Sequence, residues 1–138
     1  MRAPRKLSWQ LQRAWRSLDG RAVDLTLRLT TDEEMTVLNG RFRHQWRVTD
    51  VLTFPYSTVG VLCAGDIVIA VRRAGRQARE RKTPLATELL RLAVHGLAHL
   101  AGHDHHTAKT FVAMRQGECR ALLAALMTEA RKKCLASS

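Results

Sequence analysis

One short apolar run, residues 66–71, constrains the fold more than any other segment of the chain. Its sequence is DIVIAV, an almost continuous series of apolar and mostly β-branched side chains. Such a run is typical of a strand in the middle of a sheet, where both faces are buried. No stretch of the chain approaches the roughly 18 apolar residues that a membrane span requires, which excludes an integral membrane protein. We therefore expect a globular protein built around a central strand.

Two further segments have the character of strands. Residues 24–30 alternate polar and apolar side chains, with leucines on one face, which is the period of a half-buried strand. Residues 50–56 predict another strand, which we expect Pro55 to end. Together with the apolar run, these segments supply a small sheet.

Helical patterns fill most of the remaining chain. After an N-terminal helix, further helices are predicted at about residues 31–40, 72–82, 84–102 and 107–134. Thr31 is the expected N-cap of the first of these four, and Gly40 its left-handed stop. Thr83 is the expected N-cap of the third, with Pro84 in its first turn and Gly102 at its end.

The predicted order is helix, strand, helix, two strands and three helices. This order indicates an α/β (α+β) fold in which a small mixed β-sheet is covered by helices. A chain of 138 residues has the usual length of one domain, so we expect a single domain over residues 1–138.

The N-terminal segment and the cysteines bear on the cellular compartment. The first 20 residues are basic but lack the apolar block of a signal peptide. Their apolar side chains, from Leu7 to Leu18, follow a helical period, so we favour a helix packed on the core over a transit peptide.

Cys63, Cys119 and Cys134 form no C-x-x-C pair. This fits reduced, mostly buried thiols in a cytoplasmic protein better than a disulfide framework or a zinc ribbon.

The chain is strongly basic. It has 23 Lys and Arg against 12 Asp and Glu, a formal net charge of +11. The excess is gathered in four clusters, at residues 1–21, 41–47, 72–82 and 131–133. Separate basic clusters fit a partner with repeated negative charge, most commonly nucleic acid. The alternative is a solvated surface that keeps the protein soluble.

A histidine cluster carries the clearest chemical signal. His95 and His99 are four residues apart in a predicted helix, so their rings project from one face. Gly102 lets the chain reverse, and His105 can then return as a third ligand. Three imidazole nitrogens with an open fourth position describe a catalytic zinc site holding one Zn²⁺ ion. The alternative is a helix with buried, hydrogen-bonded histidines beside an exposed turn.

This spacing is also that of the metzincin peptidases. Those enzymes carry a glutamate directly after the first histidine as general base, whereas this chain has Gly96 at that position. Peptide hydrolysis is therefore disfavoured. His103, Asp104 and His106 either orient a ligand imidazole or face the solvent.

Three ordered motifs resemble those of one family. Residues 95–105, HGLAHLAGHDH, resemble the signature H-G-x-L-H-L-x-G-[YH]-D-H of the YbeY family, metal-dependent endoribonucleases of bacterial ribosomal RNA maturation. Residues 38–43 (LNGRFR) and 49–55 (TDVLTFP) resemble the family's L-N-x-x-[FY]-R and T-D-V-L-S-F-P. Residues 65–69 (GDIVI) resemble its G-D-I-x-I strand.

The resemblance implies roles for individual residues. His95, His99 and His105 would be the zinc ligands, and Arg43 the basic residue needed for activity beside the metal. The chemistry agrees, because phosphodiester cleavage needs a metal to polarise phosphate or activate water and a cation to stabilise the extra charge. Arginine offers a two-pronged donor suited to phosphate.

Other residues receive roles by position. Arg41 and Arg47 flank Arg43, and the three are predicted to bind RNA. His103 and Asp104 are candidates for the general base on proximity alone.

The resulting hypothesis is a cytoplasmic, single-strand-specific, zinc-dependent endoribonuclease. It would act in ribosomal RNA processing, including maturation of the 3′ end of the small-subunit RNA. Its partners would be ribosomal RNA, ribosomal particles and ribosomal or assembly-factor proteins, with no membrane. One alternative is a zinc-stabilised RNA-binding assembly factor that does not cut RNA, and another is a metal-dependent hydrolase of a different substrate.

Overall fold

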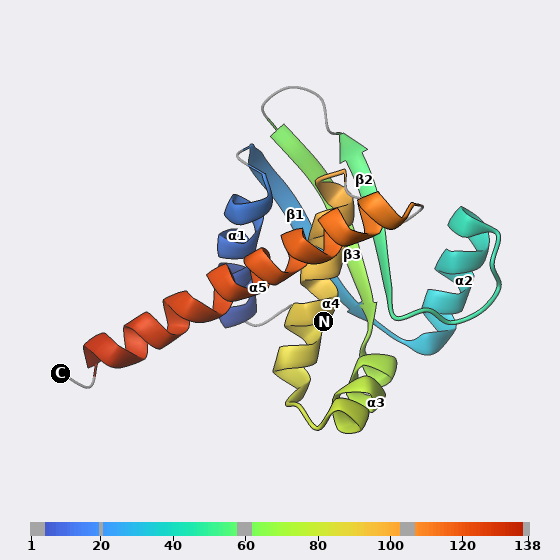
Figure 1. Cartoon of the computed structure of the whole chain (residues 1–138). Coiled ribbons are helices and arrows are strands. Elements are labelled where there is room, and N and C mark those ends of the chain that lie inside the picture. Colours follow the sequence, from blue (N-terminus) through green and yellow to red (C-terminus); the bar gives the residue numbers. More distant parts are fainter. Residues whose placement is uncertain (1–4, 20, 58–61, 103–106, 137–138) are drawn as a thin grey trace.

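The structure is a computed structural model, and it describes residues 5–19, 21–57, 62–102 and 107–136. Within these ranges the elements occur in the predicted order (Figure 1). They are α1 (Arg5–Leu18), β1 (Ala22–Thr30), α2 (Asp32–Arg43), β2 (Val51–Ser57), β3 (Leu62–Ala70), α3 (Val71–Arg81), α4 (Leu85–Leu100) and α5 (Ala108–Ala136). The prediction of an α+β fold with a small mixed sheet is confirmed.

The sheet has the strand order β1-β3-β2, so the apolar run lies in its central strand, as predicted. β3 is parallel to β1 and antiparallel to β2, and Ile67 pairs with Leu27 on one side and Thr53 on the other. β2 runs past Pro55 to Ser57, so the prediction that Pro55 ends the strand is wrong. Proline is tolerated there because β2 is an edge strand, and the register of the pairing shifts between Pro55 and Ser57.

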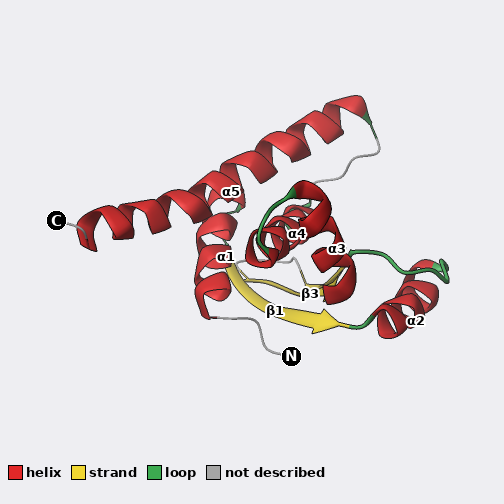
Figure 2. Ribbon diagram, turned by 90° about the horizontal axis from the view of Figure 1, so that it is seen from below, coloured by secondary structure: helices red, strands yellow, loops and turns green. Residues whose placement is uncertain are grey.

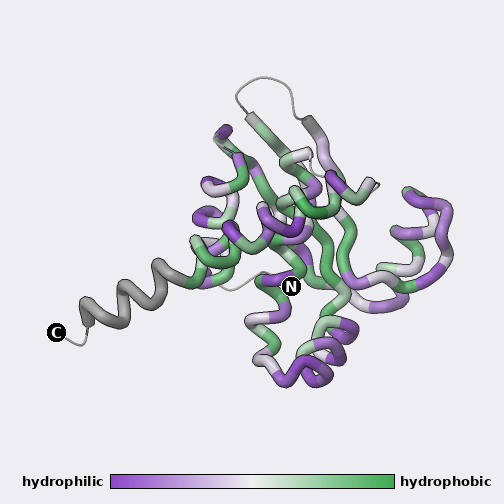
Figure 3. The backbone as a smooth tube through the Cα atoms, viewed as in Figure 1, coloured by the Kyte–Doolittle hydropathy of each residue, from purple (hydrophilic) through white to green (hydrophobic). Residues whose placement is uncertain are grey.

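Both faces of β3 are covered, which explains why this strand is apolar throughout. Ile67 and Ile69 belong to a core cluster shared with α1, α4 and α5. Val68 and Ala70 face the other way, into a smaller cluster with Met35 of α2. Figure 2 shows α1 and α4 over the same side of the sheet and α2 near the end of β1. In Figure 3 the strands are largely hydrophobic, whereas α3 is strongly hydrophilic.

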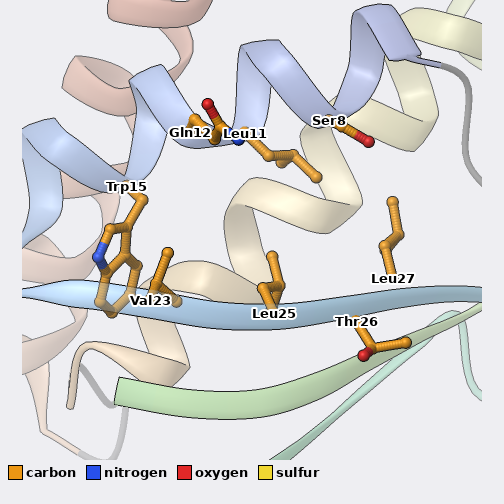
Figure 4. A pocket seen from close by; sticks show the side chains of 8 residues that line it. All are labelled: Ser8, Leu11, Gln12, Trp15, Val23, Leu25, Thr26 and Leu27. Atoms are coloured by element: carbon orange, nitrogen blue, oxygen red, sulfur yellow. The ribbon is translucent and has the colours of Figure 1, made fainter. Parts of the chain in front are cut away.

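The N-terminal helix packs on the core through its predicted apolar face. Leu7, Leu11 and Trp15 are buried, and the indole Nε1 of Trp15 donates to the carbonyl of Arg21 over 2.9 Å. A pocket between α1 and β1 is lined by Ser8, Leu11, Gln12, Trp15, Val23, Leu25, Thr26 and Leu27 (Figure 4). This lining has no ionisable side chain, so we interpret the pocket as a packing feature.

Two predicted helix ends are wrong. α2 continues three residues past Gly40 to Arg43, and its left-handed C-cap is His44 with φ of 58°. Gly40 serves packing instead, because a Cβ atom there would lie 2.2 Å from the Trp46 ring. Thr83 does not cap α4, since Pro84 is the N-cap residue and the Thr83 hydroxyl is buried without a hydrogen-bond partner in the described part of the chain.

The predicted N-cap of α2 is confirmed. The Thr31 hydroxyl accepts a hydrogen bond from the backbone N–H of Glu34 over 3.2 Å, so Thr31 caps α2. Cys63 and Cys119 are free thiols, but only Cys63 is buried, so the expectation of buried thiols is wrong for Cys119. No helix among the described residues is long and apolar enough to cross a membrane.

Candidate metal centre

The paired histidines lie on one face of α4, as their spacing predicts. The Nε2 atoms of His95 and His99 are 3.2 Å apart, and the two rings meet nearly edge to face. Both side chains are partly exposed, whereas most of α4 around them is buried. The helix therefore turns two imidazole nitrogens toward the same point at the protein surface.

The opposite face of α4 explains the glycine between the histidines. A Cβ atom on Gly96 would lie 2.9 Å from the Ile67 side chain and 3.1 Å from the Thr53 hydroxyl. That hydroxyl also donates to the Gly96 carbonyl over 3.4 Å. Position 96 faces the sheet and has no room for a carboxylate, which gives a structural reason for the missing peptidase base.

Glu118 of α5 fixes the orientation of His95. Oε1 of Glu118 lies 2.7 Å from Nδ1 of His95, and Glu118 is only 7% exposed. Burial raises the pKa of this carboxyl. The hydrogen bond from His95 and the charges of His95, Arg115 and His99 lower it by more, so the pKa of Glu118 lies below its ordinary value. A carboxylate only accepts hydrogen bonds, so Nδ1 of His95 is the donor. Nε2 of His95 then presents its lone pair toward His99.

Sequence reasoning missed Glu118, because it lies 23 residues after His95 on another helix. One signal was available. Glu118 lies at helical spacing from Met114, Ala121 and Ala125, which are all buried. An acidic residue on the buried stripe of a helix requires a partner.

A small pocket adjoins the histidine pair. It has a volume of about 270 Å³ and is lined by His95, Phe111, Met114, Arg115 and Glu118. The Arg115 guanidinium is exposed, and its Nη1 lies 3.7 Å from Oε2 of Glu118. The Arg115 cation and the His95 imidazole therefore share one concave part of the surface.

The donor set fits a zinc ion. In a tetrahedral site with Zn–N distances of about 2.0–2.1 Å, two ligand nitrogens lie about 3.3 Å apart. The Nε2 atoms of His95 and His99 lie 3.2 Å apart. A carboxylate on the far nitrogen of a ligand histidine is also a common feature of zinc sites. The described residues bring no third ligand to this pair, and His103, Asp104, His105 and His106 lie outside them.

Comparison with known proteins identifies the family. The family model described as "Endoribonuclease YbeY" matches residues 6–126. This chain belongs to the YbeY family. Two curated YbeY relatives named "Endoribonuclease YbeY" are similar to it. The protein of Gloeobacter violaceus is 46% identical over 109 residues, covering 73% of this chain and 56% of that protein. The protein of Synechococcus sp. (strain JA-2-3B'a(2-13)) is 41% identical over 116 residues, covering 77% and 71%.

A solved structure agrees with the YbeY assignment of the fold. The solution structure of TM1509 from Thermotoga maritima matches with a TM-score of 0.61 and 30% sequence identity, covering 92% of this chain and 83% of that one. The chain spans little more than half the length of several curated YbeY relatives, for example 56% of the Gloeobacter violaceus protein and 51% of the Trichodesmium erythraeum protein.

The fold brings the YbeY-like motifs together. The histidine helix α4 packs on β2 through the contact between Gly96 and Thr53. A Cβ atom on Gly65 of β3 would lie 2.8 Å from Leu100 of α4 and 2.9 Å from the Phe54 carbonyl of β2. Thr53 and Gly96, from motifs 43 positions apart in the sequence, are thus adjacent in the structure.

The three arginines predicted to bind RNA lie at the end of α2 and just after it. Arg41 and Arg43 are in the last turn of α2 and Arg47 follows it, and all three are exposed. Phe42, between the first two, packs edge to face on Phe54 with ring centroids 5.1 Å apart. This contact holds the end of α2 against β2. Within the described residues, no ion pair or hydrogen bond joins these arginines to the histidine pair.

Proposed function

We propose that this protein is a zinc-dependent endoribonuclease that cuts single-stranded ribosomal RNA. The observation that carries the proposal is the pair of Nε2 atoms on His95 and His99, 3.2 Å apart, with Glu118 on the far nitrogen of His95. Family membership supports the same reading, because the similar YbeY proteins carry endoribonuclease in their names.

The zinc site would be held by His95 and His99 through Nε2, with His105 as the third ligand that the resemblance implies. A bound zinc ion would supply a Lewis acid for a phosphate oxygen or for water. Glu118 keeps the proton of His95 on Nδ1, so Nε2 stays free to bind the metal. The exposed Arg115 beside the pocket adds a positive charge near this point.

Substrate binding is assigned to the basic surface at the end of α2. The Arg43 guanidinium would bind the phosphate, and Arg41 and Arg47 would hold the neighbouring backbone. Contacts of this kind release counterions, so RNA affinity should fall steeply with salt. His103 and Asp104 stay candidates for the general base by their place in the sequence.

The biological setting follows from the same proposal. The protein would act in the cytoplasm on ribosomal RNA and ribosomal particles, alongside ribosomal or assembly-factor proteins. Maturation of the 3′ end of the small-subunit RNA is the specific reaction that we propose.

Single-turnover cleavage of a precursor of that 3′ end tests the proposal. The parent protein and His99→Ala, purified in parallel, are compared with added zinc and with a chelator. We expect cleavage by the parent with zinc, and its loss both in the variant and with the chelator. Equal residual cleavage in all samples would indicate a contaminating nuclease and would refute the proposal. The net charge of +11 would then favour an RNA-binding assembly factor that does not cut.

A further inference from the structure

Trp46 is an exposed aromatic residue with a fixed position. Its side chain is 67% exposed, in the connection between α2 and β2. One face of the indole lies on Gly40, because a Cβ atom built there would be 2.2 Å from the ring. Glycine inside a helix is destabilising by about 1 kcal/mol relative to alanine. Glycine therefore occupies position 40 of the helix, where any side chain would collide with the Trp46 indole.

The segment that carries Trp46 is held on both sides. The backbone N–H of His44 donates to the Gly40 carbonyl over 3.1 Å, and that of Gln45 donates to the Asn39 carbonyl over 3.3 Å. After Trp46, the buried Asn39 side chain donates from Nδ2 to the Arg47 carbonyl over 2.9 Å. The tryptophan is therefore presented by a hydrogen-bonded turn, with its second face toward the solvent.

The charged side chains at positions 41, 43 and 47, on both sides of Trp46 in the sequence, are arginines. Arg41, Arg43 and Arg47 are exposed, and no carboxylate of the described residues forms an ion pair with them. Nη2 of Arg47 instead donates to the side-chain oxygen of Gln45 over 3.0 Å. Aromatic faces flanked by arginines are typical of surfaces that bind single-stranded nucleic acid, where bases stack and phosphates are neutralised.

We propose that Trp46 is a stacking platform for one unpaired base of the RNA, with Arg41 and Arg47 on the flanking phosphates. The identity of the strand as RNA rests on the proposed function, whereas the platform itself rests on the geometry of Trp46 and Gly40. Bases in a duplex are already stacked on one another, so the platform selects single strands over double strands.

Titration of two labelled ten-nucleotide probes tests the platform. One probe is oligoadenylate, and the other has the same backbone and charge but no bases. Fluorescence anisotropy is measured with a chelator present, so that binding is followed without cleavage. The variants are Trp46→Leu, which keeps an apolar cover on Gly40, and Trp46→Phe, which restores a ring. Trp9→Ala is the matched control, because Trp9 also lies beside an arginine, 5.3 Å from Arg13, but on α1.

We expect Trp46→Leu to lose about five- to a hundred-fold in affinity for oligoadenylate, the usual range for one stacked base. Its affinity for the abasic probe and the salt dependence of binding should stay at parent values, and Trp46→Phe should recover most of the loss. Arg47→Gln should instead reduce the slope of log affinity against log salt by about 0.7 for both probes.

Equal losses for the two probes, no loss for oligoadenylate, or the same loss in Trp9→Ala would overturn the platform. The result is independent of the nuclease test. If the parent cuts RNA but Trp46→Leu binds oligoadenylate as the parent does, the platform fails and the nuclease stands. If the parent binds through Trp46 but cuts nothing, the nuclease fails and the platform stands.

Discussion

Glu118 and His95 lie on different helices, and their side chains meet over 2.7 Å between Oε1 and Nδ1. The contact links α5 to the helix that carries both described histidines of the candidate metal centre. It determines which nitrogen of His95 has the proton, and therefore which nitrogen can bind a metal.

We expect Glu118→Ala to weaken zinc binding by about 10- to 100-fold, the usual effect of losing a carboxylate that orients a ligand histidine. Glu118→Gln should have a smaller effect, because its amide oxygen still accepts from Nδ1. Competition with a chromophoric chelator measures the zinc affinity directly. Glu33→Gln, a change at an exposed position of α2, is the control. Parent-like zinc affinity in a folded Glu118→Ala protein would remove Glu118 from the site.

Gly96→Ala should reduce the free energy of unfolding by about 1–3 kcal/mol, because its Cβ would overpack the contact of α4 with the sheet. The nearest atoms are 2.9 Å away on Ile67 and 3.1 Å away on Thr53. Gly75→Ala in α3 is a matched control, since nothing lies within 4 Å of its added Cβ. That change should stabilise by about 0.5–1 kcal/mol through helix propensity. Urea unfolding of both variants measures these changes. A Gly96→Ala protein more stable than the parent would contradict the close packing of α4 on the sheet at this position.

Glu88→Gln should lower the free energy of unfolding by about 2 kcal/mol. This is near the low end of the cost of breaking a buried ion pair, because the arginine partners can still contact water. Glu88 is 1% exposed, and its Oε1 lies 2.5 Å from Arg91 and 3.7 Å from Arg81. Both arginines are partly exposed, so each can be solvated when the carboxylate is lost. Chemical denaturation measures the effect, with Glu80→Gln on the exposed face of α3 as the neutral comparison. Equal stabilities of the two variants would argue against this ion-pair network.

The ionised Asp19 side chain should stabilise the folded protein, and this stabilisation should be lost in acid. The side-chain hydrogen bond from Arg21, at 2.7 Å from Nη2 to Oδ2, lowers the pKa of Asp19 despite partial burial. Its folded pKa lies below the unfolded value of about 3.9. The contribution is therefore complete above that value and is lost as the pH falls through the folded pKa. The difference in unfolding free energy between the parent and Asp19→Asn should shrink below about pH 4. A constant difference down to pH 2 would contradict this assignment.

Patterns within one element were predictable, because they depend on neighbours along the chain. The buried strand, the Thr31 cap and the pairing of His95 with His99 all follow from periods and caps of this kind. The fold class followed from the order of these elements.

The errors share a different cause, which is contact with residues outside the predicted element. Gly40 has the sequence character of a helix stop, but its role is to accommodate Trp46. Thr83 has the character of a cap, but its backbone N–H donates to the Ala78 carbonyl and closes the end of α3. Glu118 was missed because its partner His95 lies on another helix.

The position of Pro55 also affects how separate molecules meet. β1 and β2 are the edge strands of the three-stranded sheet, so each pairs with β3 on one side only. Unpaired edges of this kind can recruit strands from other molecules. Pro55 has no N–H to offer in β2, and the register shift beside it interrupts the ladder. On β1, the outward-facing Asp24 and Arg28 are charged. Both edges of the sheet thus carry features that disfavour extension by a strand of another molecule.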